Sequence, residues 1–426
     1  MKNKIGLGLI GCGLRGTGYF TTLRYKDFNF QVVALADVSE RNLKSANAKY
    51  ADNTAKMYKT GDELVKDSSV DAVIVATPNK FHRDPAIAVM NSGFPMLLEK
   101  PIATSLEDLT AIWSSSQQSQ AKVVVGFTLR YTPFYQTIKN IIQKGVLGQI
   151  LTINAEEMMS DRLSMIFCRS QWRHDCNLTG GLLLEKCCHD VDILNWISDS
   201  KAVKVSSFAN RSFLTPGKVP KRSCDKCPEK KICRFSREKL LSSFYDNVTE
   251  TKTDLNHLYS ELINNECPYH IGTPYPDHQS LLISYENGVL CTFNVIQAQP
   301  ANRRTIHILG SEARLYGVID DNCFTIFHRT GPNNEKPEVI RVDCDSYGHN
   351  GGDPVLATDF IDLINGKQNP SRPGIKEGIE SAIICLIGDK SAETRQSIEL
   401  TEYRNQVFAD TNISRSAVIA KPLAVN

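Results

Sequence analysis

The stretch Ile5–Gly16, IGLGLIGCGLRG, decides the fold of the first part of the chain. Its apolar half is typical of a β-strand, and the strand runs into the pattern G-x-G-x-x-G, which opens a helix. In this pattern the first glycine permits a tight turn, the second lets the backbone approach a pyrophosphate, and the third allows close helix–strand packing. The helix N-terminus then faces the phosphates. We therefore predict that a dinucleotide binds at Gly11, Cys12, Gly13, Leu14, Arg15 and Gly16.

An acidic residue strengthens this prediction, because the glycine pattern alone also fits an ordinary turn between a strand and a helix. Asp37 directly follows a second apolar strand, residues 31–36. A carboxylate at this point typically binds the hydroxyls of the adenosine ribose. Its charge repels a 2′-phosphate and favours NAD over NADP, although Arg41 nearby can neutralise such a phosphate. We predict NAD as the cofactor, with NADP as the alternative.

The first 127 residues alternate between short apolar runs and helical patterns. Further strands are predicted at 70–76, 95–98 and 122–127, and helices between them include 85–92 and 105–117. Alternation of strands and helices at this spacing predicts βαβ units and a parallel, doubly wound sheet. Residues 1–127 are therefore predicted to form a Rossmann domain that binds NAD.

After about residue 128 the pattern changes to the period-two alternation of antiparallel strands. Asn287-Gly288 lies between two such strands and predicts a β-hairpin. Residues 128–426 are therefore expected to form an α+β domain with a large, mainly antiparallel sheet, interrupted by a Cys-rich insertion at 214–239. Its strands are predicted at 150–158, 204–213, 279–285, 289–297, 303–309 and 339–342, and its helices include 182–197, 354–364 and 375–390.

The composition excludes several classes of protein. Hydrophobic residues make up 41% and charged residues 23% of the 426 residues, as in ordinary globular chains. The net charge is +2, and no basic stripe suggests nucleic-acid or membrane-surface binding. No apolar run approaches the roughly 18 residues of a membrane span, and the N-terminus lacks the features of a signal peptide. We expect a cytoplasmic protein that binds no nucleic acid and no membrane, with its 13 cysteines mostly reduced.

Seven stretches of the chain resemble the glucose–fructose oxidoreductase/inositol dehydrogenase (Gfo/Idh/MocA) family. They are GLIGCGLRG, ALADVSER, VDAVIVATPNKFH, LLEKPIATS, GFTLRYTPFY, GGLLLEKCCHDVDIL and NGGDPVLATDF. The resemblance implies a Rossmann domain followed by an open-faced sheet domain. It also implies a homo-oligomer, a dimer or a tetramer, formed through the exposed face of the second sheet.

Glu99-Lys100-Pro101 follows the predicted strand 95–98, so it lies at the sheet edge where ligands of doubly wound folds collect. A lysine there can donate a hydrogen bond to a substrate hydroxyl and support proton movement, but a solvated loop lysine fits the spacing equally well. The resemblance implies that Lys100 is catalytic and that Glu99 lies at the cofactor. It also implies that the loop after strand 70–76 lines the nicotinamide, through Thr77, Pro78, Asn79 and His82.

The predicted helix 182–197 carries Glu185, His189 and Asp192 on one face, spaced at i, i+4 and i+7. A histidine suits a general base because its pKa lies near neutrality, although a single histidine on a helix is usually incidental. The resemblance implies that His189 is catalytic, since the family has Asp-x-x-x-His on this helix. Glu185 stands where the family has Asp. Its side chain is one methylene longer, so the position of the substrate relative to this carboxylate is not carried over from the family.

Other residues are expected to line the substrate pocket. The resemblance implies a location near the cleft, without individual roles, for Arg130, Tyr131, Trp172, Arg173 and Asp192. Asp277 and His278 lie at a strand entrance, where they can add polar groups or cap a turn.

The insertion contains Cys224-x-x-Cys227-x5-Cys233, a spacing that predicts a structural zinc site lacking one ligand. Resemblance to related subfamily members implies Cys267 as the fourth ligand. Free thiols or a disulfide are the alternatives.

These observations lead to one principal hypothesis. The protein is expected to be an NAD-dependent oxidoreductase that transfers a hydride between a secondary alcohol of a sugar, sugar derivative or cyclitol and the nicotinamide. His189 removes the hydroxyl proton, Lys100 polarises the oxygen, and Glu185 orients the pair. The alternatives are a redox-neutral lyase, epimerase or glycosidase that uses NAD at the same site, and a non-catalytic nucleotide sensor.

Overall fold

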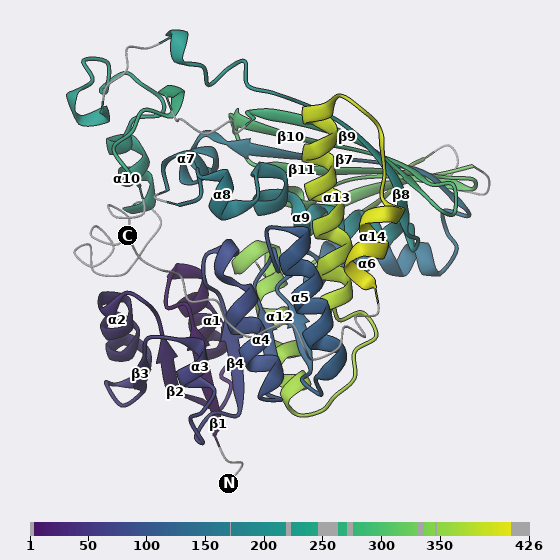
Figure 1. Cartoon of the computed structure of the whole chain (residues 1–426). Helices are drawn as coiled ribbons and strands as arrows, with labels where there is room; N and C mark the ends of the chain where they lie inside the picture. Colours follow the sequence, from purple (N-terminus) through teal and green to yellow (C-terminus); the bar gives the residue numbers. More distant parts are fainter. Residues whose placement is uncertain are drawn as a thin grey trace.

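A parallel sheet organises the lower half of the molecule in Figure 1. The structure, a computed structural model, describes residues 4–170, 172–218, 223–245, 263–270, 276–329, 336–345 and 347–409. Within these residues the first sheet has six strands in the order β3-β2-β1-β4-β5-β6, all parallel, which confirms the predicted doubly wound sheet. They are β1 (Ile5–Ile10), β2 (Phe30–Ala36), β3 (Lys56–Tyr58), β4 (Ala72–Val75), β5 (Met96–Leu98) and β6 (Val123–Val125).

Helices cover both faces of this sheet. Val73 and Val75 of β4 share a buried cluster with Val89 of α4, whereas Ile74 shares another with Phe20 of α1. Strand β3 was not predicted, because its three residues form no apolar run and two of them are exposed. The helices are α1 (Leu14–Tyr25), α2 (Glu40–Ala51), α3 (Gly61–Leu64), α4 (Arg83–Asn91) and α5 (Leu106–Gln118).

A second, mixed sheet fills the upper half of Figure 1. The described residues form nine strands in the order β14-β13-β12-β11-β7-β10-β9-β8-β15, and every neighbouring pair is antiparallel except β7 with β10. The predicted mainly antiparallel sheet and the Asn287-Gly288 hairpin are confirmed. The strands are β7 (Ile150–Ser160), β8 (Ala202–Asn210), β9 (His278–Tyr285), β10 (Leu290–Gln299), β11 (Arg303–Gly310), β12 (Ala313–Val318), β13 (Cys323–His328), β14 (Glu338–Arg341) and β15 (Ile398–Glu399).

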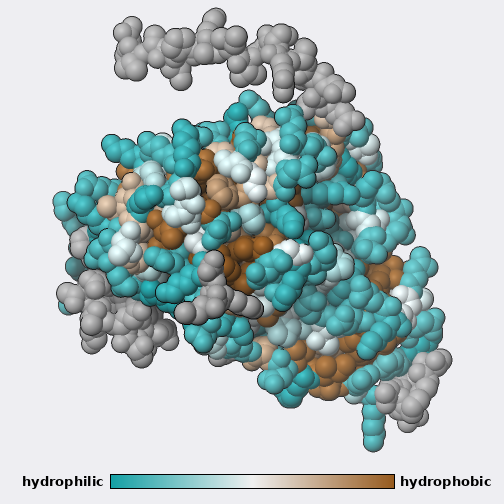
Figure 2. All heavy atoms as spheres, turned by 90° about the horizontal axis from the view of Figure 1, so that it is seen from below, coloured by the Kyte–Doolittle hydropathy of each residue, from teal (hydrophilic) through white to brown (hydrophobic). Residues whose placement is uncertain are grey.

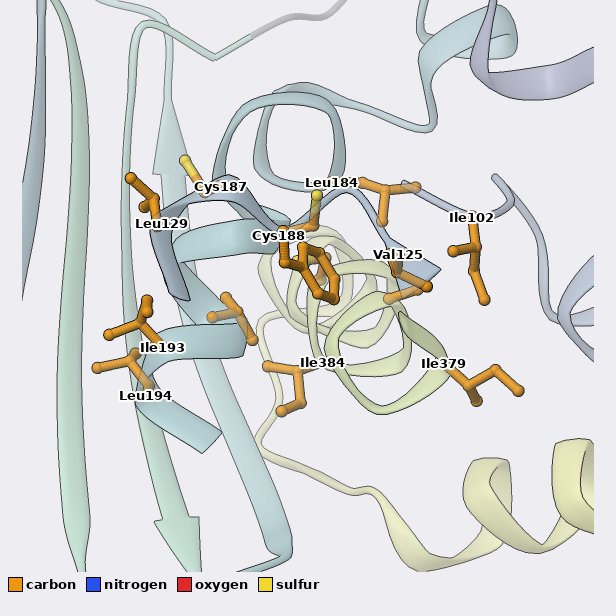
Figure 3. Close-up of a cluster of buried hydrophobic side chains, with 14 of the residues drawn as sticks. Ile102, Val125, Leu129, Leu184, Cys187, Cys188, Ile193, Leu194, Ile379 and Ile384 are labelled. Carbon is orange, nitrogen blue, oxygen red and sulfur yellow. The ribbon is translucent and has the colours of Figure 1, made fainter. Parts of the chain in front are cut away.

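One hydrophobic cluster joins the two sheets. Figure 3 shows part of it, with Ile102 and Val125 from the first domain, Leu184 and Cys188 from α9, and Ile384 from α13. The predicted boundary at residue 127 therefore does not separate two independent cores. The helices of this half are α6 (Pro133–Gln143), α7 (Asp161–Arg169), α8 (Cys176–Thr179), α9 (Leu182–Ser198), α10 (Arg237–Tyr245), α12 (Gly348–Ile364), α13 (Ile375–Thr394) and α14 (Thr401–Phe408).

Helix α12 returns to the first domain. Leu356 and Phe360 of α12 lie in the same buried cluster as Leu9 of β1 and Phe20 of α1. In Figure 1 this light-green helix accordingly lies among the purple and blue helices of the Rossmann domain. Residues from the far end of the sequence are thereby brought next to the glycine-rich turn.

The connection between β8 and β9 runs from residue 211 to residue 277 and contains the predicted insertion at 214–239. Its described residues have a small cluster of their own, in which Leu214, Phe235 and Ile263 pack on Met165 of α7. The insertion is therefore attached to the second domain through α7.

Figure 2 shows the molecule from below, where hydrophobic residues form separate patches on a largely hydrophilic surface. Among the described residues, no helix combines the length and the apolar character that crossing a bilayer requires.

Candidate active site

The glycine-rich turn between β1 and α1 leaves space at the helix N-terminus. Gly11 has φ +94°, and a Cβ placed on it would lie 2.6 Å from backbone atoms of Ala76 and Thr77. A Cβ on Gly13, the N-cap of α1, would meet no atom within 4 Å. The turn therefore needs glycine at position 11, and the open side at Gly13 lets phosphates approach the backbone. The residues present fit a dinucleotide.

Asp37 is held at the edge of the sheet beside this turn. Its Oδ2 accepts a hydrogen bond from the backbone N–H of Cys12 at 2.7 Å, and its Oδ1 accepts one from Ser39 at 2.8 Å. Each carboxylate oxygen keeps a lone pair for a ribose hydroxyl. Leu14 and Val38 next to it are exposed apolar side chains that can cover the cofactor.

Lys100 of the first domain is anchored to a helix of the second. It follows β5, its peptide bond to Pro101 is cis, and its Nζ donates to the backbone carbonyl of Glu185 in α9 at 2.6 Å. His189 lies one helical turn after Glu185, and burial together with the charges of Arg304 and Lys100 lowers its pKa well below the usual range. The structure thus brings the two predicted catalytic groups into one place.

Arg304 of β11 is a member of the site that the sequence analysis missed. Its Nη2 donates to Nε2 of His189 at 3.2 Å, while its Nε lies 2.8 Å from Oδ1 of Asp190 and 2.6 Å from Oε2 of Glu157. Since a guanidinium only donates, Nε2 of His189 must be the acceptor. His189 is therefore neutral, with its proton on Nδ1 when this contact is made.

A signal for Arg304 was present in the sequence. The strand alternation places Glu157 on the buried face of β7 with Ile153 and Ala155, and Arg304 on the buried face of β11 with Ile306. Arg304 and Glu157 are direct neighbours in the pairing of the two strands. Charged residues at apolar positions are costly to bury alone, so they point to a paired site.

The carboxylate of Glu185 contacts residues other than Lys100 and His189, the pair that it was predicted to orient. It accepts a hydrogen bond from Asn79 Nδ2 and lies 3.2 Å from Arg173 Nη1. It thus connects the loop after β4 to the segment before α8, and it is the backbone oxygen of Glu185, not the carboxylate, that holds Lys100. Trp172 lies beside this contact, because the Arg173 guanidinium is 5.1 Å from the centre of the Trp172 ring.

His82 connects two loops of the first domain. Its Nδ1 lies 2.7 Å from the carbonyl oxygen of Pro101, and its Nε2 lies 2.7 Å from that of Thr77, whose hydroxyl donates to Phe81. The ring is buried with a backbone carbonyl oxygen at each nitrogen, so neither nitrogen is open to a ligand. We therefore regard His82 as a residue that positions Thr77, Pro78 and the Lys100-Pro101 turn.

Arg15 and Glu99, which were expected at the cofactor, form hydrogen bonds with other residues of the protein. Oε1 of Glu99 accepts from Arg15 and from the Tyr19 hydroxyl, and its Oε2 accepts from the backbone N–H of Lys100 at 2.9 Å. Although burial opposes it, the charges of Arg15 and Lys100 hold the pKa of Glu99 below its usual value. Arg15 donates further to Asp353 of α12 at 2.9 Å. The pair thus fixes the Lys100 turn against α1 and α12.

Three residues expected to line the substrate pocket have their polar atoms satisfied inside the protein. Arg130 forms a bidentate ion pair with Asp192, at 2.6 and 2.7 Å, and both side chains are buried. Tyr131 donates to Asp359 at 2.7 Å. Burial raises the pKa of Asp192 to about 6, against the opposing charge of Arg130. We therefore leave these residues out of the substrate site proposed below.

The structure does not support the predicted zinc site. Among the described residues, which include Cys224, Cys227, Cys233 and Cys267, no group of three or more metal-ligating side chains comes together. The Sγ of Cys224 instead accepts a hydrogen bond from the backbone N–H of Arg237 at 3.2 Å, and burial raises the pKa of the Cys267 thiol. In the described part of the chain all four are free thiols.

Comparison with protein families gives two matches along the chain. Residues 5–127 match the model described as "Oxidoreductase family, NAD-binding Rossmann fold". Residues 135–316 match the model described as "GFO/IDH/MocA C-terminal domain".

Individual relatives are distant in sequence. YteT of Bacillus subtilis (strain 168), which is named as an oxidoreductase, is 25% identical over 347 residues, covering 76% of this chain and 79% of the relative. The inositol 2-dehydrogenase of Salmonella typhimurium is 28% identical over 216 residues, covering 50% of this chain and 61% of that enzyme. The chain thus spans about three fifths of the inositol dehydrogenase that it matches.

Solved structures show the same fold. A levoglucosan dehydrogenase in complex with NADH and levoglucosan has a TM-score of 0.71 at 15% identity, covering 93% of this chain and 100% of that one. The scyllo-inositol dehydrogenase from Lactobacillus casei has a TM-score of 0.66 at 16% identity, covering 94% of this chain and 99% of that one.

Proposed function

Because the chain belongs to the Gfo/Idh/MocA oxidoreductase family and is thus an enzyme, we propose that it is an NAD-dependent dehydrogenase of sugars or cyclitols. The hydride passes between a secondary alcohol carbon and the nicotinamide. The observation that carries the proposal is the bond from Lys100 Nζ to the backbone of α9, which brings Lys100 near His189. The names of the inositol and levoglucosan dehydrogenases that resemble the chain support the substrate class.

The chain's own residues would hold the cofactor at two points. The turn Gly11–Gly16 receives the pyrophosphate at the N-terminus of α1, and Asp37 receives the adenosine ribose. The carboxylate disfavours a 2′-phosphate, so NAD is preferred over NADP. When bound, NAD supplies the hydride acceptor, and the protein supplies positioning and proton handling.

Proton removal is assigned to His189. The substrate hydroxyl takes the place of Arg304 Nη2 at the Nε2 lone pair, and Lys100 Nζ donates a hydrogen bond to the same oxygen. Arg304 remains hydrogen-bonded to Asp190 through its Nε and ion-paired with Glu157. The lowered pKa keeps His189 unprotonated, and therefore able to accept a proton, at neutral pH.

Asp190 is placed to stabilise the imidazolium that this step produces. Its Oδ2 lies 3.5 Å from Nε2 of His189. Within the described residues this oxygen is buried and has no hydrogen-bond donor. An N–H formed on His189 therefore has an acceptor, which offsets the cost of creating a buried charge.

The test is NADH formation by the wild type and by Lys100→Met and His189→Ala, with myo-inositol, scyllo-inositol and levoglucosan as substrates. Each variant should lose at least about 100-fold in kcat, the range of acid–base catalysis, while its affinity for NAD stays unchanged. Lys66→Met, at an exposed lysine of the first domain, is the control and should behave as the wild type. Full activity in either active-site variant would refute the assignment, and product formation without net NADH would favour the redox-neutral alternative.

A further inference from the structure

Four consecutive residues before Asp353 adopt left-handed backbone conformations. The φ angles are 45° at Gly348, 43° at His349, 51° at Asn350 and 82° at Gly351. Glycine adopts this region freely, whereas His and Asn do so at a cost in free energy. Strain of this kind is retained where the surrounding structure enforces it, and it is concentrated at functional sites.

Several contacts enforce the left-handed turn. Asn350 Nδ2 donates to the carbonyl of Ile319 at 3.1 Å, and the Gly351 N–H donates to Tyr347 at 3.1 Å. Nδ1 of His349 lies 2.8 Å from Oδ2 of Asp353. The imidazole is thus held in one orientation, with a carboxylate at Nδ1.

The same carboxylate connects the turn to the active site. Oδ1 of Asp353 accepts from Arg15 at 2.9 Å, and Arg15 in turn bonds to Glu99, the residue before Lys100. His349 is also one of the groups that lower the pKa of His189. The turn therefore lies on the side of the molecule where the Lys100 turn and α9 meet.

His349 keeps one nitrogen available for a ligand. Its side chain is 43% exposed, although Asp353 beneath it is only 9% exposed. Nδ1 is used by Asp353, and among the described residues Nε2 has no hydrogen-bond partner. An exposed imidazole in an enforced orientation is suited to recognising a polar group.

We propose that His349 is a substrate-binding residue whose Nε2 hydrogen-bonds a hydroxyl next to the one that is oxidised. This inference rests on the proposed function, since Lys100 and His189 take the reacting hydroxyl and leave a neighbouring hydroxyl for His349. His349 then determines which alcohol of a polyol faces the nicotinamide. The residue lies beyond the part of the chain that the family models match, 5–127 and 135–316.

Three substitutions at one position test this inference. His349→Gly removes the ring but favours the left-handed backbone, so the turn is preserved. His349→Gln places an amide near the position of Nε2, whereas His349→Asn places one near Nδ1. We expect kcat/KM for myo-inositol and levoglucosan to fall by about 10-fold in the Gly and Asn variants, the worth of one hydrogen bond, and by less in the Gln variant.

His328 provides a control. Its ring is also held by a carboxylate, with Nε2 2.9 Å from Oε2 of Glu338, but it lies in β13 and is not among the residues assigned to the site. His328→Gln should leave kcat/KM unchanged. Affinity for NAD and the melting temperature are measured for every variant, and both should stay at the wild-type values.

Monodeoxy-inositols provide a second readout. The wild type should discriminate against the analogue that lacks the hydroxyl bound by His349, and His349→Gly should lose this discrimination. Unchanged kcat/KM in the Gly variant, a loss confined to NAD affinity, or a Gln variant as poor as the Gly variant would each overturn the inference. If the wild type itself oxidises none of the polyols, it is the proposed function that fails.

Discussion

Arg304 donates a hydrogen bond to the one nitrogen of His189 that can accept a proton, with Nη2 and Nε2 3.2 Å apart. The contact makes the imidazole neutral in the absence of substrate, because a positive charge beside it and burial both oppose protonation. In the proposed mechanism the same guanidinium must give up this contact when a hydroxyl binds. Arg304 then acts as a positioning residue that sets the protonation state of His189.

Replacing Arg304 should change the pH dependence of the enzyme. In Arg304→Gln the pKa of His189 should rise, so the acidic limb of the kcat/KM profile moves to higher pH, because the base is lost as it protonates. Lys100, Lys186 and His349 still oppose protonation in the variant, so the shift is partial.

A pH series of kcat/KM for NADH formation measures this shift. Arg303→Gln is the matched control, since Arg303 is the adjacent residue, 42% exposed, and pairs with Asp321 instead. A profile of Arg304→Gln that coincides with the wild type would contradict the assigned role. If Arg304→Gln does not fold, the pH series is measured on Arg304→Lys in its place, because the lysine keeps a positive charge near Asp190 and Glu157.

Asp37 should decide the choice of cofactor. Asp37→Asn removes the negative charge and retains one oxygen, which can accept from either the Cys12 or the Ser39 N–H group, whereas the two carboxylate oxygens of Asp37 accept one each. We expect its Kd for NAD to rise by about 10-fold, a loss equivalent to one charge-assisted hydrogen bond, while binding of NADP improves relative to NAD. Titration calorimetry measures both, with Asp84→Asn, at a side chain that is 87% exposed, as the control. If the ratio of the NAD and NADP affinities were the same in the wild type and in Asp37→Asn, Asp37 would not determine the choice of cofactor.

The shared hydrophobic cluster should make the two domains unfold together. Ile384 is fully buried, so Ile384→Ala should reduce the free energy of unfolding by about 2–5 kcal/mol. Denaturant unfolding followed by fluorescence and by circular dichroism should give one coincident transition in the wild type and the variant. Met57→Ala, at a side chain in an exposed position of β3, should change stability by less than about 0.5 kcal/mol. Two separate transitions would show that the domains are independent.

The outer face of the second sheet should mediate self-association. Leu282, Tyr316 and Val339 lie in one row across the paired strands and are 51%, 46% and 59% exposed. A dimer or tetramer that covers this face should dissociate in the double variant Leu282→Glu, Tyr316→Glu. Light scattering after size exclusion measures the mass, and Met57→Glu is the control. A wild type that is monomeric at micromolar concentration would refute this prediction.

The parts of the fold that depend on local chemistry could be predicted from the sequence. Gly11 and Gly13 determine a turn within a few residues, Asp37 ends its own strand, and Asn287-Gly288 makes a hairpin by itself. The short strands β3 and β15, of three and two residues, carry too few residues for a pattern. Their formation depends on the neighbours with which they pair.

The candidate site was predicted only where a motif marks it. Lys100 and His189 belong to recognisable stretches, whereas Arg304, Glu157 and His349 become neighbours of the site only after β7 pairs with β11 and α12 returns to the first domain. For Arg130 and Asp192 the sequence motifs suggested substrate contacts that the fold does not leave open. The two side chains form a buried ion pair with each other, so their charges are already used within the protein.

Lys100 is held by a main-chain oxygen, which every amino acid possesses. Position 185 can therefore exchange its side chain, and the carbonyl that anchors the ammonium group stays where it is. In the proposed enzyme, the residues around Arg173 can then vary while Lys100 keeps its place beside α9.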